Sequence, residues 1–107
     1  MISEERLEKA LTFLATTDER SADLKGQVAR KEYGAKLARS KVYLVSEGSV
    51  EARKAISEVS PEVQQAEDEL VQAIVEHERV KAKRATEELI VEVWRSVEAS
   101  RRQGTIK

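Results

Sequence analysis

The 107-residue chain has no cysteine, one histidine and one proline, and only 4% of its residues are aromatic. Without cysteine the chain has no disulfide bond, no thiolate catalysis and no zinc–cysteine site. A single histidine excludes a histidine-rich metal site. Few aromatic residues and a charged fraction of 36% argue against a large globular core. This composition is instead typical of long helices and coiled coils.

Long apolar runs are also missing. The longest unbroken one runs from Val42 to Val45, which is far too short for a membrane span. Glu4 and Glu5 stand where a signal peptide would carry positive charge. We therefore expect a cytoplasmic protein with a single domain, residues 1–107, that has no membrane partner and no cofactor.

The first half of the chain has the pattern of one long helix, from about residue 3 to 46. Ser3 is a favourable N-cap, and the acidic residues after it suit the helix dipole. Apolar or small residues recur at heptad spacing, interrupted by Lys31. This seam is Leu7, Ala10, Leu14, Thr17, Ser21, Leu24, Val28, Ala35, Ala38, Val42 and Val45. Gly26 and Gly34 each cost about 1 kcal/mol inside a helix, and the sequence leaves open whether either one breaks it.

A stop signal follows at Glu47, Gly48 and Ser49, because glycine suits the left-handed position after a helix and serine caps the next one. A short helix is predicted from about residue 49 to 58. Its apolar residues have helical spacing, so we expect it to lie across the end of a bundle. They are Ala52, Ala55, Ile56 and Val59.

Ser60 and Pro61 mark the start of a second long helix, from about residue 61 to 102, since proline suits the first helical position and serine caps it. We expect the residues after Gly104, which are Thr105, Ile106 and Lys107, to be frayed. Its seam is Val63, Ala66, Leu70, Ala73, Val80, Val91 and Trp94.

Two long helices joined by a short corner predict an antiparallel hairpin. If paired residue numbers sum to about 107, Val45 lies opposite Val63. Seam charges then gain opposite partners, which fixes the register. The predicted pairs are Arg20 with Glu87, Asp23 with Arg84 and Lys31 with Glu76.

Each long helix also carries a second apolar stripe, and a two-helix hairpin has only one inside. The fold class we predict is therefore all-α, a long coiled-coil-like hairpin with a short corner helix that assembles into a homo-oligomeric bundle. The alternative is that the short helix and tolerated surface alanine and valine account for the stripe. The candidate interface residues are Leu11, Ala22, Gly26, Ala29, Tyr33 and Leu37 on the first helix and Val71, Ile74, Ala82, Leu89 and Val93 on the second.

No set of residues suggests catalysis or metal binding. His77 lies between two glutamates, but a di-iron bundle needs Glu-x-x-His motifs, and Ile74 stands where that glutamate would be. We interpret His77 as structural and Trp94 as a core residue. We expect a protein that is not an enzyme.

Charge is distributed in blocks. Residues 25–41 carry six bases against one acid, and residues 79–84 carry four bases. A basic belt of this kind binds phosphate backbone without reading sequence. A solvated, internally paired face is the alternative. The candidate nucleic-acid-binding residues are Lys25, Arg30, Lys36, Arg39, Arg79, Lys81 and Lys83.

The segment ELIVEVWRSVEASRRQG, residues 88–104, together with ATTDE from Ala15, resembles small helical proteins encoded by tailed bacteriophages and prophages. The genes of such proteins often lie near those of single-strand-annealing recombination proteins. The resemblance implies an accessory protein of phage DNA recombination or replication, in the host cytoplasm, that binds DNA or a recombination protein. The alternative is an inhibitor or adaptor that binds a host protein through an acidic corner. That corner is Glu62, Glu67, Asp68 and Glu69.

Overall fold

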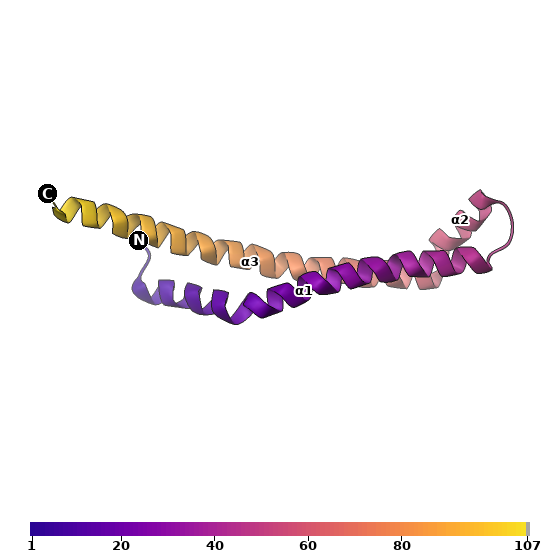
Figure 1. Ribbon diagram of the computed structural model, residues 1–107, viewed down its shortest axis with the longest axis horizontal. Helices are drawn as coiled ribbons and strands as arrows, with labels where there is room; N and C mark the ends of the chain where they lie inside the picture. Colours follow the sequence, from indigo (N-terminus) through magenta and orange to yellow (C-terminus); the bar gives the residue numbers. More distant parts are fainter. Residues whose placement is uncertain (107) are drawn as a thin grey trace. The chain divides into compact units, whose positions relative to one another are not determined.

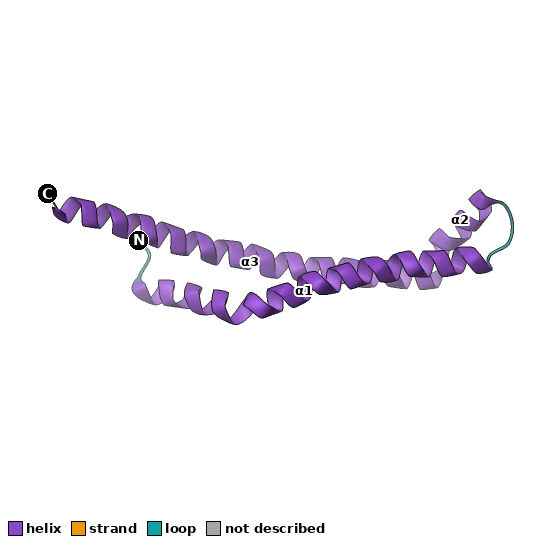
Figure 2. Cartoon of the chain, in the orientation of Figure 1, coloured by secondary structure: helices purple, strands orange, loops and turns teal. Residues whose placement is uncertain are grey.

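The computed structural model describes residues 1–106, with side chains to residue 104, and contains three α-helices (Figure 1). They are α1 (Glu4–Val45), α2 (Val50–Val59) and α3 (Pro61–Ile106), of 42, 10 and 46 residues. The described residues form no strand, as Figure 2 shows. The all-α prediction is confirmed.

The predicted signals at the first two helix starts are confirmed. The Ser3 hydroxyl accepts a hydrogen bond of 3.1 Å from the Arg6 amide, and Ser49 accepts one of 3.1 Å from the Ala52 amide. Gly48, between α1 and α2, has φ of 113°, a conformation that favours glycine. Neither Gly26 nor Gly34 interrupts α1.

α3 begins at Pro61 as predicted, but it differs from the prediction at both ends. The Gln64 amide donates to the Ser60 carbonyl at 3.0 Å, while the Ser60 hydroxyl makes no hydrogen bond within the described chain. The helix also continues through Gly104 to Ile106, so the prediction of a frayed end is wrong for Thr105 and Ile106, and Lys107 lies outside the described residues. An ion pair of 3.3 Å between Arg101 and Glu98 supports these last turns.

The chain divides into two compact units. Unit 1 comprises residues 1–22 together with the chain from residue 79 onward, and unit 2 comprises residues 23–78. In unit 1, Arg6 pairs with Glu87 and Asp18 pairs with Arg84. In unit 2, Lys31 pairs with Glu69 and Arg39 with Glu67. Rising numbers on α1 meet falling numbers on α3 in both units, so the antiparallel pairing is confirmed.

The predicted seam forms the core. All its residues on both long helices are buried or half-buried, except Val45, which is 82% exposed. The apolar residues with least exposure are Ala10 in unit 1, and Leu24, Ala35, Val63 and Ala73 in unit 2. Three of these five are alanines, so the helices pack closely but bury little side-chain volume.

The predicted hairpin register is wrong. Lys31 pairs with Glu69 rather than Glu76, seven residues earlier on α3. In unit 1, Glu87 pairs with Arg6 instead of Arg20, and Arg84 bonds to Asp18 instead of Asp23. The direction of the shift is the same in each case. The observed partner has a lower residue number than the predicted one.

The position of α2 accounts for the shift in unit 2. α2 does not lie across the end of the hairpin but packs against the last turns of α1. The Ser57 hydroxyl donates to the Arg39 carbonyl at 3.2 Å, and Arg53 donates to the Tyr43 carbonyl at 3.1 and 2.8 Å. Because α2 covers these turns, α3 begins beside an earlier part of α1. Val45 is left without a partner on α3.

α2 packs with its polar side inward, contrary to the prediction. Its buried residue is Ser57, and its half-buried ones include Arg53. The apolar residues expected to face the bundle are exposed. They are Ala52, Ala55, Ile56 and Val59.

Truncating the core should cost far more than truncating the outside of the same helix. We predict that Leu24→Ala, at 4% exposure, lowers the free energy of unfolding by about 2–3 kcal/mol. The matched control Leu44→Ala, at 73% exposure, should change it by less than about 0.5 kcal/mol. Urea unfolding followed by circular dichroism measures both changes. Equal losses of unfolding free energy would contradict the assignment of Leu24 to the buried seam.

Gly34 offers a test in the opposite direction. A Cβ atom built at this position meets nothing within 4 Å, and the residue is in mid-helix. We predict that Gly34→Ala raises the free energy of unfolding by about 0.5–1 kcal/mol, because alanine loses less backbone entropy on folding. A fall in the urea midpoint would show that the position is more crowded than the structure indicates.

Candidate interaction surfaces

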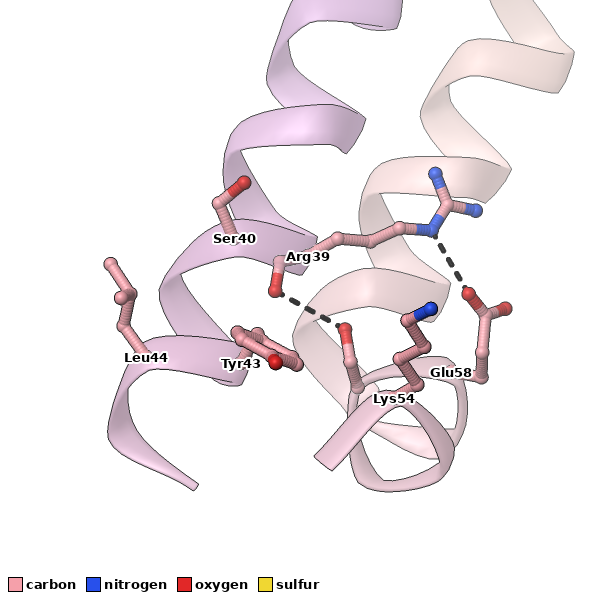
Figure 3. A pocket seen from close by; sticks show the side chains of 7 residues that line it. Arg39, Ser40, Tyr43, Leu44, Lys54 and Glu58 are labelled. Atoms are coloured by element: carbon pink, nitrogen blue, oxygen red, sulfur yellow. Dashed lines mark hydrogen bonds and ion pairs between the residues drawn. The ribbon is translucent and has the colours of Figure 1, made fainter. Parts of the chain in front are cut away.

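The corner where α1 meets α2 contains a hollow of about 700 Å³. Figure 3 shows Arg39 of α1 reaching over it to Glu58 of α2, at 3.2 Å between Nε and Oε1. The Arg53 guanidinium lies 4.0 Å from the centre of the Tyr43 ring, which fixes one wall. The lining residues are Arg39, Ser40, Tyr43, Leu44, Lys54, Ser57 and Glu58.

The chemistry of this hollow suits binding rather than catalysis. Its one buried hydroxyl, on Ser57, already donates to a backbone carbonyl. Its carboxylate, on Glu58, is neutralised by Arg39. No general base lies beside a nucleophile among the lining residues, so the hollow can accept an apolar side chain but has no catalytic pair.

The α1 segment of unit 2 carries an exposed set of bases, which we call the basic face. The whole α1 segment of unit 2, residues 23–45, has six bases against two acids. Lys31 and Arg39 are used within the unit by the ion pairs to Glu69, Glu58 and Glu67. The four others are exposed and form no ion pair among residues 1–104. The basic face is Lys25, Arg30, Lys36 and Lys41.

The predicted nucleic-acid residues are therefore not equivalent. Lys25, Arg30 and Lys36 belong to the basic face, whereas Arg39 is held by two glutamates. In unit 1, Lys83 lies 4.6 Å from the centre of the Phe13 ring, while Arg79 and Lys81 are exposed. These last three belong to a different unit from the basic face.

Lys41 was not among the predicted nucleic-acid-binding residues, although it lies eleven residues after Arg30 and is exposed in the same way.

The acidic corner is half neutralised. Glu67 pairs with Arg39, and Glu69 pairs with Lys31 at 3.3 Å and accepts from Gln65. These contacts lower the pKa of Glu69, with the Gln65 hydrogen bond contributing most. Glu62 and Asp68 remain exposed and unpaired among residues 1–104. Two free carboxylates make a weaker docking site than the four predicted.

The second apolar stripes are exposed in the single chain. Of the predicted interface residues, all are exposed except Gly26, which is half-buried. Tyr33 is 69% and Val71 55% exposed. Packing within the chain therefore leaves these stripes without a partner. Whether a second chain covers them stays a prediction.

Unit 1 contains a polar seam that sequence reasoning did not pair correctly. Arg6 Nη2 donates to Glu87 Oε1 at 2.8 Å, and Arg6 Nη1 lies 2.8 Å from Oε2, in an ion pair without hydrogen-bond geometry. Arg84 donates to the Leu14 carbonyl, the Thr17 hydroxyl and the Asp18 carboxylate. Charged residues at heptad seam positions indicate in the sequence that such pairs exist. Only the correct register of the two helices shows which residues pair.

His77 is half-buried in the seam of unit 2, with Nδ1 3.9 Å from a carboxylate oxygen of Glu78. The described residues bring together no three histidine, aspartate or glutamate side chains that would hold a metal ion. Among residues 1–106, no helix is both long and apolar enough to cross a membrane.

Comparisons with protein-family models, curated proteins and solved structures gave no match.

The Arg6 and Glu87 pair predicts an acid dependence of stability. The hydrogen bond from Arg6, opposed by burial and aided by charge, lowers the pKa of Glu87 below its ordinary 4.5. The stabilisation is therefore present above the unfolded-state pKa and is lost as pH falls through the folded-state pKa. We expect Glu87→Gln to reduce the loss of unfolding free energy between pH 7 and pH 3.

Urea unfolding at the two pH values measures this effect. Arg6→Gln is the matched variant, because it removes the cause of the lowered pKa and should also reduce the acid loss. If wild type and Glu87→Gln lost equal stability, the pair would have no role in the pH dependence.

Proposed function

We propose that the protein is a non-enzymatic binding protein that contacts the phosphate backbone of nucleic acid through the basic face of unit 2. The observation that carries the proposal is that these four bases stay exposed while neighbouring bases are used in ion pairs. A base already held by a carboxylate must break that contact before it neutralises a phosphate. An exposed base that forms no ion pair can neutralise a phosphate without losing a contact.

The spacing of the basic face suits a repeating backbone. Lys25 and Lys36 are eleven residues apart, as are Arg30 and Lys41. Eleven residues are about three helical turns, or about 16 Å, so each pair stays on one side of α1. The two pairs lie about 140° apart around the helix, so each pair can contact two phosphates about 16 Å apart on its own side of α1. Contacts to phosphates carry no sequence information. Binding independent of sequence follows.

The setting we propose is DNA recombination or replication, as the resemblance of residues 88–104 to phage proteins suggests. The exposed apolar stripes support a further part of the proposal, that the protein works as a homo-oligomer. The cytoplasm is the location that we propose for it. The alternative partner, a host protein with a basic site, would use Glu62 and Asp68 of the acidic corner.

The salt dependence of DNA binding tests the basic face. We expect wild type to bind duplex and single-stranded DNA at about 50 mM salt, with log K falling against log salt with a slope of about −3 to −4 for four contacts. Lys25→Glu with Lys36→Glu should make this slope shallower by about 2. Fluorescence anisotropy with labelled oligonucleotides of unrelated sequence measures both.

A matched control carries the same change in charge elsewhere on α1. Lys9→Glu with Arg20→Glu, in unit 1, should leave the slope close to that of wild type. No binding by wild type at low salt, or equal effects of the two double variants, would refute the basic face as the contact.

A further inference from the structure

Unit 2 has two outward apolar faces on opposite sides of its seam. On α1, Tyr33 and Leu37 lie two residues before and after buried Ala35, which is about 200° around the helix. On α3, Val71 and Val75 stand in the same relation to buried Ala73. Because Ala35 and Ala73 face each other's helix, these two apolar pairs face away from the seam.

The charges around the two faces are opposite. The α1 face lies among the four bases of the basic face. The α3 segment of unit 2, residues 61–78, carries six acids and no lysine or arginine. Asp68 and Glu78 stand at the two ends of the Val71 and Val75 pair, and both are exposed. One side of the unit is therefore apolar and basic, and the other is apolar and acidic.

The spacings on the two faces also match. Tyr33 and Leu37 are four residues apart, as are Val75 and Val71. Arg30 and Lys41, which flank the first pair, are eleven residues apart. Asp68 and Glu78, which flank the second pair, are ten residues apart. In an antiparallel arrangement, apolar residues meet apolar residues while each end brings a base toward an acid.

We propose that a second copy of this chain occupies the α1 face, and that it does so with the α3 face of its own unit 2. Charge disfavours the symmetric alternatives. An α1 face against another α1 face brings bases together, and two α3 faces bring acids together, which is unfavourable. The contact is therefore head to tail. Because its two halves lie on opposite sides of the unit, each added copy presents a new free face, and the assembly stays open.

This stacking uses two bases, Arg30 and Lys41, that the proposed function assigns to nucleic acid. The stacking does not depend on the proposed function, but the competition with nucleic acid described next rests on it. The acidic face of a neighbouring copy and a phosphate backbone compete for Arg30 and Lys41. Stacked copies would cover Arg30 and Lys41, and nucleic acid bound at these two bases would disperse them.

The test measures the mass of the full-length protein without DNA, by sedimentation velocity over a range of concentrations. The contact is small, so we expect association to depend on concentration. The average mass should rise from the 12.0 kDa monomer and continue beyond the dimer. Arg30→Glu with Lys41→Glu should remove association, and so should Asp68→Lys with Glu78→Lys. An equimolar mixture of the two variants should regain it.

Two controls accompany these measurements. Lys9→Glu with Arg20→Glu should associate as wild type does, and circular dichroism checks that each variant is helical. A wild-type monomer at all concentrations would overturn the proposal. Loss of association from the α1 reversal alone, with none from the α3 reversal, would also overturn it in favour of a symmetric α1 contact.

Adding duplex DNA then separates the two proposals. Dispersal of wild-type assemblies supports both the stacking and the shared bases. If the protein stacks as predicted but binds no DNA, the stacking is supported and the proposed function is refuted. A rise in assembly mass with DNA bound at full occupancy would overturn the shared bases.

Discussion

Two paired helices can bury only one stripe of each, and the rest of the structure depends on this limit. In both units that stripe is a heptad seam, and its most buried residues are Ala10 in unit 1 and Val63 and Ala35 in unit 2. Alanine allows close helix packing but removes little apolar area from water. Specific polar contacts supplement the seam, such as Arg6 with Glu87 in unit 1 and Lys31 with Glu69 in unit 2.

The same limit leaves much of both long helices on the surface. Outside the seam, most side chains of the long helices are exposed, while Ser57 and Arg53 of α2 pack against α1. In unit 2, the ion pairs to Glu67 and Glu69 use two bases of α1 and leave four exposed. Folding thus selects which charges are left for a partner, and this selection is the basis of the proposed nucleic-acid contact.

The heptad pattern predicted the helices, their antiparallel pairing and the buried seam, because periodicity depends only on local spacing. It did not predict the register, which in unit 2 depends on where α2 lies, and α2 is held by bonds from Arg53 and Ser57 to backbone carbonyls. Backbone carbonyls are present at every residue, so a sequence gives no sign of which one accepts. The basic block was also visible in the sequence, whereas the engagement of Arg39 and Lys83 required the fold.

The polar attachment of α2 has a consequence for motion. Its apolar residues are already in water, so separating α2 from α1 exposes little new apolar surface. What must break is the contact of Ser57 with the Arg39 carbonyl, the contacts of Arg53 with Tyr43 and the pair of Glu58 with Arg39. Local opening of this kind has a low free energy compared with global unfolding. Opening of α2 alone would therefore release Arg39 from Glu58 while leaving its pair with Glu67 in place.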